Sequence, residues 1–178
     1  MRIFRAITKF IKMALITLGG NPAETIGTLP KIGSKANDFS LTATDMTDKS
    51  LKDYSGFKKL LNIFPSVDTG VCAASARKFN EAASKMENTK VLCISRDLPF
   101  AQKRFCAAEG IENVEMLSDF KTGLFGKEYG LEIAKSAFQG LHSRVVIVLD
   151  ENNTVLYTEQ VPEIGQEPNY EAALNALQ

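Results

Sequence analysis

The stretch from Leu60 to Asn80 constrains the fold of this chain more than any other. The apolar residues 60–64 indicate a buried strand that Pro65 ends, and the Ala-rich residues after Cys72 recur with helical spacing. Cys72 therefore lies where a loop becomes a helix. The unpaired N–H groups and the positive dipole end at such a point favour a thiolate over a thiol. The sequence thus predicts a reactive cysteine here.

The chain around this stretch indicates an α/β protein. Residues 90–95 form a second continuous apolar run, of the kind that parallel sheets bury, so residues 60–95 predict a strand–helix–strand unit. Further expected elements are an N-terminal hairpin (14–18 and 24–29), a strand (39–44), a helix (98–108) capped by Asp97 and ended by Gly110, a strand (115–118), a short helix (122–129), a hairpin (144–149 and 154–160) and a helix opened by Pro168.

Length and composition limit the classes of protein. A chain of 178 residues fits one domain with a single core, and 44% apolar and 24% charged residues are normal for a soluble protein. The sequence contains no run of about 18 apolar residues that would span a membrane. The formal net charge is zero and the body of the chain has no basic stripe, so a nucleic-acid partner is not expected.

Residues 1–12 differ from residues 13–178, which we expect to form the domain. Arg2, Arg5, Lys9 and Lys12 give this segment a charge of +4, and apolar residues between them recur at helical spacing. Three interpretations stay open, namely a membrane-surface or targeting segment, a poorly structured extension, and a start annotated upstream of Met13. A cleaved secretory signal fits worst, because the apolar core is too short. We favour a basic amphipathic extension with no catalytic role.

Three cysteines and one histidine, His142, must supply any reactive chemistry. A zinc site would need all four residues, and the chain has no Cys-x-x-Cys pair, so no metal is expected. A protease-like cysteine–histidine pair would have to use His142, for which a polar residue just before a strand is the simpler interpretation. Thiol redox chemistry, which needs neither metal nor cofactor, is what remains.

A thiolate that acts as a nucleophile in such chemistry needs donors that stabilise the departing group, and a fixed cation. The Thr69 hydroxyl and the backbone of residues 69–71 can donate, and Pro65 can shield the sulfur from water. Arg144, at the start of a core strand, is the best candidate for the cation, although an ordinary charged strand end fits the residues equally well. Arg77, one turn into the helix, is a second candidate.

The other two cysteines differ in their surroundings. Cys93 stands in an apolar strand, where core packing is the simplest interpretation, whereas Cys106 lies near the end of a helix. A residue near a helix end can move by local unwinding and one inside a sheet cannot. This mildly favours Cys106 as a partner for Cys72, but the sequence alone does not choose between them.

Three motifs resemble the thiol peroxidase branch of the peroxiredoxins, the atypical two-cysteine peroxiredoxins of bacteria. They are Phe-Pro-Ser-Val-Asp-Thr-Gly-Val-Cys-Ala-Ala-Ser (64–75), Leu-Cys-Ile-Ser (92–95) and Asp-Leu-Pro-Phe-Ala-Gln-Lys-Arg-Phe-Cys (97–106). The resemblance covers residues 16–177 and implies a thioredoxin-like (peroxiredoxin) fold, with a central mixed sheet flanked by helices and an N-terminal hairpin.

The resemblance also implies roles for residues and partners. Cys72 would be oxidised by hydrogen peroxide or alkyl hydroperoxides, and Cys106 would resolve the sulfenic acid into a Cys72–Cys106 intrachain disulfide that thioredoxin reduces. The family pattern places its arginine at Arg144. A cytoplasmic homodimer is expected, with residues 122–140 as candidates to line a pocket for organic peroxides.

Two other functions remain as alternatives. A thioredoxin-like thiol–disulfide oxidoreductase usually has Cys-x-x-Cys, but position 69 is Thr. A peroxide sensor or holdase would use the same oxidation of Cys72 to expose a surface. Many turnovers with peroxide and thioredoxin would indicate an enzyme, and one oxidation event per chain would indicate a sensor.

Overall fold

The computed structural model describes residues 13–178, and the extension expected over residues 1–12 lies outside the described residues. The described part contains ten strands, four α-helices and one short 3-10 helix. The strands are β1 (Leu15–Leu18), β2 (Asn21–Thr25), β3 (Leu41–Ala43), β4 (Asp48–Lys49), β5 (Lys58–Ile63), β6 (Thr89–Ser95), β7 (Glu115–Ser118), β8 (Ile133–Lys135), β9 (Val145–Leu149) and β10 (Val155–Gln160). The helices are η1 (Leu51–Tyr54), α1 (Gly70–Ala83), α2 (Pro99–Glu109), α3 (Leu124–Glu128) and α4 (Tyr170–Asn175).

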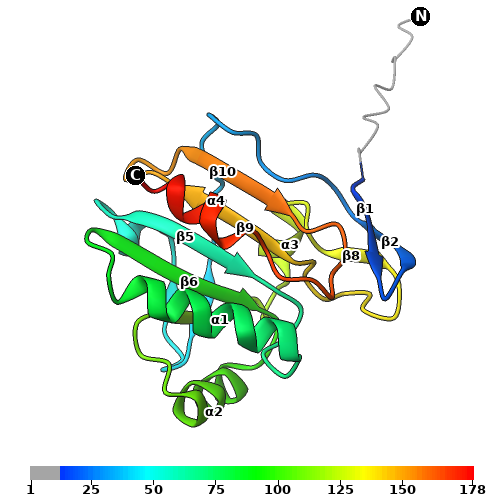
Figure 1. Ribbon diagram of the computed structural model, residues 1–178, viewed down its shortest axis with the longest axis horizontal. Coiled ribbons are helices and arrows are strands. Elements are labelled where there is room, and N and C mark those ends of the chain that lie inside the picture. The colour runs from blue at the N-terminus through cyan, green and yellow to red at the C-terminus, as the bar shows by residue number, and fades with distance from the viewer. Residues whose placement is uncertain (1–12) are drawn as a thin grey trace, which may run out of the picture.

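A seven-stranded mixed sheet forms the centre of the protein, in the order β10-β9-β5-β6-β7-β3-β4. β5, β6 and β7 run parallel, and α1 crosses over between β5 and β6 (Figure 1). β9 pairs antiparallel with β5, and β10 with β9. The central strands β5, β6 and β9 are almost wholly buried, because helices cover both faces of the sheet.

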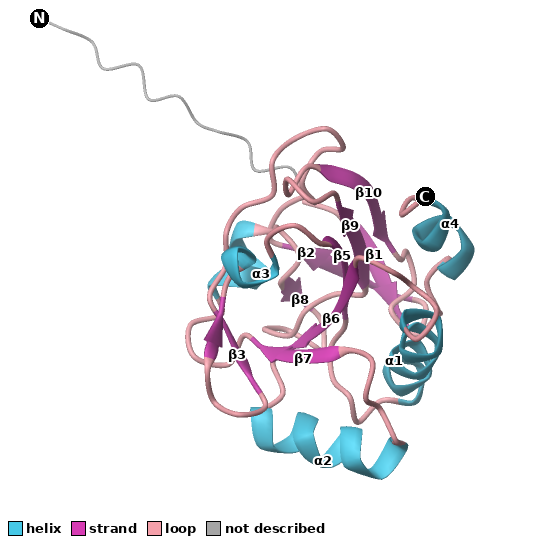
Figure 2. Ribbon diagram, turned by 90° about the vertical axis from the view of Figure 1, so that its left-hand side faces the viewer, coloured by secondary structure: helices cyan, strands magenta, loops and turns pink. Residues whose placement is uncertain are grey.

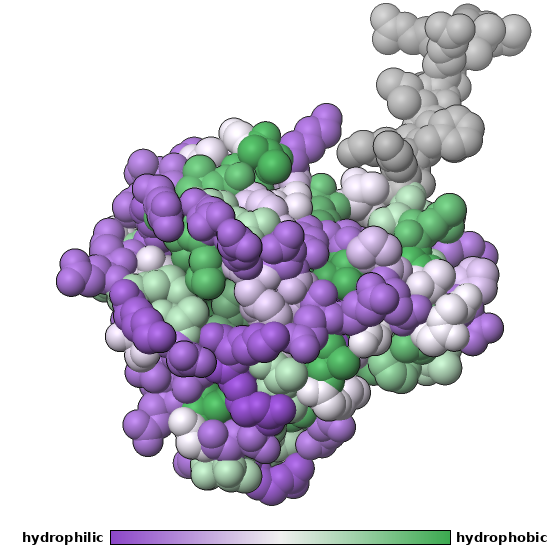
Figure 3. All heavy atoms as spheres, viewed as in Figure 1, coloured by the Kyte–Doolittle hydropathy of each residue, from purple (hydrophilic) through white to green (hydrophobic). Residues whose placement is uncertain are grey.

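The two faces of the sheet bury alternate residues of each central strand. Leu60, Val146 and Val148 pack beneath α1 and α4, whereas Leu61 and Ile147 face the side of α3. Figure 2 shows α1 and α4 on one side of the sheet, α3 on the other and α2 beyond β7. The outer surface over α1 is mainly hydrophilic, with scattered apolar side chains (Figure 3). No helix within residues 13–178 is long and apolar enough to cross a membrane.

The N-terminal hairpin forms a second, three-stranded sheet, in the order β1-β2-β8. Its apolar side chains Ile16 and Ala23 pack with Ile133 and Ile164 into a small core of their own. Thr17 forms a bridge to Glu163, which joins the hairpin to the segment after β10. The predicted thioredoxin-like fold, with its mixed sheet and N-terminal hairpin, is confirmed.

Several predicted boundaries shift by a few residues. The helix expected after Cys72 begins at Gly70, so Cys72 lies in its first turn, and it ends at Ala83 instead of near Met86. The helix expected over residues 122–129 is shortened to α3 because Gly123, its N-cap, has a left-handed conformation (φ 65°). α2 ends before Gly110 (φ 64°), as predicted, which leaves Cys106 in its last turns.

Candidate active site around Cys72

The side chain of Cys72 is fully buried in the first turn of α1. The first intrahelical hydrogen bond runs from the Ala73 N–H to the Thr69 carbonyl (3.0 Å), so the N–H groups of residues 70–72 lie ahead of it. These groups and the helix dipole place partial positive charge around the sulfur. The local environment predicted from the sequence is therefore present.

Two side chains donate hydrogen bonds to the Cys72 sulfur. The Thr69 hydroxyl lies 2.7 Å from Sγ, and the Arg144 NH2 group lies 3.3 Å from it. Arg144 is 2% exposed, and its Nε donates to the Ile164 carbonyl (2.8 Å). Its NH1 group is buried and has no partner within residues 13–178. The guanidinium thus has one free donor beside the sulfur.

Arg77, the second candidate for the cation, does not point toward Cys72. Its guanidinium pairs with Glu109 of α2 at 2.8 Å, and both side chains are substantially exposed. The structure therefore brings Arg144 to the sulfur and leaves Arg77 on the surface.

A small cavity of about 150 Å³ opens beside this group of residues. Its polar lining comes from Thr69 and Arg144, and the remainder is mainly apolar. The other lining residues are Leu18, Pro65, Gly70, Val71, Phe138, Ile164 and Gly165. A larger hollow of about 550 Å³ lies between α1 and α4, but neither Thr69 nor Arg144, the two residues that bond the Cys72 sulfur, lines it. We therefore place the reaction at the smaller cavity.

Residues 122–140 were expected to line a pocket for organic peroxides, but of these residues Phe138 alone lines this cavity. Thr122 and Gly123 line a separate polar hollow instead. Leu18 and Ile164, which the sequence did not single out, provide the other large apolar walls.

All three cysteines are free and contribute to one apolar cluster. Cys93 is fully buried within β6, where burial raises the pKa of its thiol to about 12. Cys106 is partly exposed in α2, and burial raises the pKa of its thiol as well. Both thiols are therefore protonated at neutral pH.

Asp97 fixes the loop that leads to Cys72. Its carboxylate accepts hydrogen bonds from the Ser66 hydroxyl (2.8 Å), the Val67 N–H (2.8 Å) and the Ser95 hydroxyl (2.7 Å). The prediction that Asp97 caps the next helix is wrong, because the N-cap of α2 is Leu98. The carboxylate is instead directed back toward the active-site loop, where it restrains the residue after Pro65.

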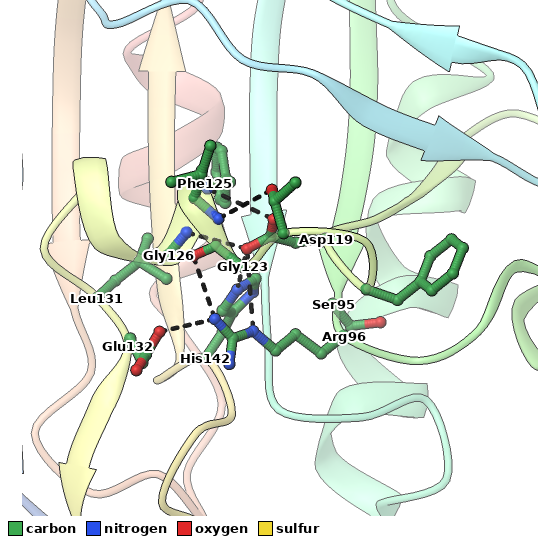
Figure 4. A network of polar contacts seen from close by, with 12 residues as sticks. Ser95, Arg96, Asp119, Gly123, Phe125, Gly126, Leu131, Glu132 and His142 are labelled. Carbon is green, nitrogen blue, oxygen red and sulfur yellow. Dashed lines mark hydrogen bonds and ion pairs between the residues drawn. The ribbon is translucent and has the colours of Figure 1, made fainter.

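A buried polar network lies behind the start of β9 (Figure 4). Arg96 donates to Glu132 (2.7 Å) and to the carbonyls of Gly123 and Gly140. His142 Nε2 lies 3.0 Å from the Asp119 carboxylate. The network joins segments on both sides of α3 and holds the chain two residues before Arg144.

His142 lies just before β9, as expected, and is fully buried in this network, where it bonds Asp119 and no cysteine. Asp119 also accepts from the Gly126 N–H (3.1 Å), and a Cβ at Gly126 would come within 2.9 Å of the His142 ring. Burial lowers the pKa of His142, and its Nδ1 has no partner among residues 13–178. The ring is therefore neutral and donates from Nε2.

Comparisons with known proteins give consistent results. Residues 31–174 match the model of the Redoxin family. The chain is 54% identical over 165 residues to a thiol peroxidase of Corynebacterium glutamicum, an alignment that covers 93% of this chain and 99% of the relative.

Two solved structures are similar over most of their length. A peroxiredoxin-like protein from Aquifex aeolicus superposes with a TM-score of 0.87 at 37% identity, covering 93% of this chain and 96% of that one. A thiol peroxidase from Chromobacterium violaceum superposes with a TM-score of 0.85 at 25% identity, covering 92% and 95%.

The buried, neutral His142 predicts an acid-sensitive stability. The unfolded chain binds a proton on this residue near the ordinary pKa of 6.5, whereas the folded protein binds it only at a lower pH. The free energy of unfolding should therefore fall as the pH drops below about 6.5, until the lower pKa of the folded state is reached. Urea denaturation between pH 8 and pH 5 measures this effect.

His142→Gln provides the matched control, because the chain has one histidine and an amide can still donate to Asp119. The variant should lose the wild-type pH dependence between pH 7 and pH 5.5. Equal pH dependence in the two proteins would contradict the assignment of a neutral, buried His142.

Proposed function

The chain belongs to the Redoxin family, within its thiol peroxidase branch, and from this membership we infer that Cys72 is the nucleophile of its thiol-dependent peroxidase reaction. The observation that carries the assignment is the contact of the Cys72 sulfur with Arg144 and Thr69 at the wall of a cavity. The motif resemblance to the thiol peroxidase branch is confirmed, and the reduction of peroxides follows from it.

In the first step, the Cys72 thiolate attacks one oxygen of the peroxide, the O–O bond breaks and the other oxygen leaves. Cys72 becomes a sulfenic acid, and the leaving oxygen takes up a proton to give water or an alcohol. The free NH1 group of Arg144 is available to stabilise the charge on that oxygen. Pro65, at the cavity wall, limits the access of water to the sulfur.

In the second step, Cys106 forms a disulfide with Cys72 and water is released. Both residues belong to the same apolar cluster, which supports the pairing. Cys72 is fully buried, so one of the two helical turns must unwind before the sulfurs can bond. An external dithiol, which we propose is thioredoxin, then reduces the disulfide.

Cys93 has no step in this scheme. It lies within the central sheet, where its sulfur accepts a hydrogen bond from Asn62 (3.5 Å). Its strongly raised pKa and its fixed position make it a packing residue.

A dithiol oxidoreductase of the Cys-x-x-Cys type fits less well, because the Thr69 hydroxyl occupies the place of the second thiol and donates to Cys72. A peroxide sensor would use the same residues but would react once per chain. Consumption of many equivalents of peroxide with thioredoxin would support the enzyme.

We also propose a homodimer, formed through an exposed apolar patch beside α2. Leu98 (51%), Phe100 (65%), Phe120 (36%) and Leu124 (52%) are unusually exposed for large apolar residues. The Ser118 hydroxyl donates to the Asp97 carbonyl, which brings the loop of Phe120 next to Leu98. A second copy that covers this patch would remove the apolar surface from water.

Every residue of this scheme lies within residues 13–178. This supports the proposal that residues 1–12 form an extension without a catalytic role. The use of free, reactive cysteines further supports a cytoplasmic location.

The cysteine variants test the order of steps. Cys72→Ser should abolish peroxide reduction, because a hydroxyl is not ionised at this site. Cys106→Ser should react once and stop at the sulfenic or sulfinic acid, and Cys93→Ser should retain turnover with thioredoxin. Peptide mapping after one equivalent of peroxide should find Cys72 joined to Cys106. A Cys72–Cys93 bond would refute the role of Cys106 and leave that of Cys72 intact.

Arg144→Lys tests the cation. The substitution keeps the charge and removes the planar guanidinium, which donates at the same time to the Cys72 sulfur and to the Ile164 carbonyl. We expect the rate of the peroxide-dependent step to fall about 100-fold, as for the loss of one donor that stabilises a transition state. Arg77→Lys is the control, because Arg77 lies on the surface of α1 and pairs with Glu109, and it should keep the wild-type rate. Competition kinetics measures the step.

Phe100→Glu tests the dimer. A buried, unpaired carboxylate in the patch should convert the protein to a monomer in light scattering at micromolar concentration. Ile32→Glu is the matched control, because Ile32 is 64% exposed and lies beside β10, at the other edge of the sheet. Dimers in both variants, or a monomeric wild type, would refute this interface.

A further inference from the structure

One carboxylate outside the proposed chemistry, that of Glu163, accepts four hydrogen bonds. The Thr17 hydroxyl (2.7 Å) and the Gly20 N–H (3.0 Å) donate to Oε2. The Gly19 N–H (3.0 Å) and the Gly165 N–H (2.9 Å) donate to Oε1. These bonds, the one from Gly165 first, lower the pKa of Glu163 to about 2, so the group is ionised throughout the physiological range.

These bonds tie the turn between β1 and β2 to the segment after β10. Gly19 and Gly20 connect β1 to β2 in left-handed conformations (φ 59° and 79°) that glycine adopts without strain. Within residues 13–178, the hydrogen bonds that link these two glycines to a segment outside the hairpin are the two to Glu163. The orientation of the turn therefore depends on this carboxylate.

The turn carries one wall of the cavity beside Cys72. Leu18 precedes Gly19 and lines the cavity, where it packs in one apolar cluster with Ile164 and Phe138. The organic part of a hydroperoxide that reacts at Cys72 would have to lie against these apolar side chains, because the polar side chains that line the cavity are those of Thr69 and Arg144. Hydrogen peroxide has no organic part and makes no use of this wall.

We propose that Glu163 is a positioning residue that fixes the Leu18 wall of the cavity and thereby sets the preference for organic hydroperoxides over hydrogen peroxide. The inference rests on the proposed function of Cys72. Glu163 acts through the Gly19–Gly20 turn and does not contact the sulfur.

The cation is held independently of this carboxylate. The Ile164 carbonyl accepts a hydrogen bond from Arg144 Nε. Two backbone bonds keep Ile164 in place. The Ile164 N–H donates to the Thr17 carbonyl (2.9 Å), and the Thr17 N–H donates to the Pro162 carbonyl (2.7 Å). Loss of the Glu163 charge should therefore loosen the Gly19–Gly20 turn next to Leu18 and leave Arg144 at the sulfur. Reduction of hydrogen peroxide should survive a change that impairs reduction of an organic peroxide.

Glu163→Gln tests the proposal with a side chain of the same shape. Its amide nitrogen replaces one carboxylate oxygen and directs N–H groups at the two donors of that oxygen. These donors are the Gly19 and Gly165 N–H groups at Oε1, or the Thr17 hydroxyl and the Gly20 N–H at Oε2. With cumene hydroperoxide and hydrogen peroxide as substrates, we expect the ratio of their kcat/KM values to fall about tenfold, the effect of losing one or two apolar contacts. The fall should arise from a higher KM for cumene hydroperoxide, with the hydrogen peroxide value unchanged within about twofold.

Two further variants complete the test. Thr17→Val removes one of the four donors and should lower the ratio by less than Glu163→Gln does. It also serves where the glutamine variant does not fold. Glu81→Gln, an exposed glutamate of α1 paired with Lys85, should leave the ratio unchanged.

The outcomes distinguish this inference from the function on which it rests. An unchanged ratio in both Glu163→Gln and Thr17→Val, or an equal fall for both peroxides, would overturn the role of Glu163. A wild-type protein that reduces neither peroxide would instead refute the role of Cys72.

Discussion

The contact between the buried Arg144 guanidinium and the Cys72 sulfur is the interaction on which the site depends. A guanidinium with 2% exposure has lost most of its hydration, and the structure must replace it with hydrogen bonds and an opposite charge. The Ile164 carbonyl supplies one bond, and the sulfur supplies the other. In the reaction that we propose, a Cys72 thiolate would also supply the opposite charge that the buried cation lacks.

The local part of this arrangement could be predicted from the sequence, because short-range patterns determine it. Two apolar strands, a proline and an Ala-rich helix specify the unit that places Cys72 at a helix start, and the glycine at position 110 specifies the end of α2. The identity of the cation could not be derived in this way. Arg144 is 72 positions from Cys72, and only the pairing of β9 with β5 brings it there. From the residues alone, a cation at the sulfur and an ordinary charged strand end were equally good interpretations of Arg144, and the resemblance to the family decided between them.

The supporting carboxylates were missed for a related reason. Glu163 accepts mainly from backbone N–H groups, and Asp97 accepts from two hydroxyls and one backbone N–H. Most of these donors lie in segments distant in the chain, and a sequence does not show where they point. A helix cap was therefore predicted for Asp97, since Asp often caps helices. For His142, the signal that could have helped is Gly126, which leaves room for the ring, but the two residues are 16 positions apart and meet only in the folded protein.

The site combines a fixed cation with a nucleophile on an element that can move. Arg144 is held by the bond from its Nε to the Ile164 carbonyl, and the network of His142 and Asp119 holds the chain two residues before it. Cys72 instead lies in the first turn of α1, whose N-cap residue, Thr69, makes no side-chain cap within the described part of the chain. The Thr69 hydroxyl donates to the sulfur, and its oxygen accepts no hydrogen bond from the backbone N–H groups of the first turn, so this turn lacks a bond that usually stabilises helix starts by about 1 kcal/mol. In the reaction that we propose, oxidation of a Cys72 thiolate would remove the anion that accepts from both Thr69 and Arg144. Formation of the sulfenic acid would therefore weaken the turn that has to open for Cys106 to reach Cys72, while the cation would stay in place for the next cycle.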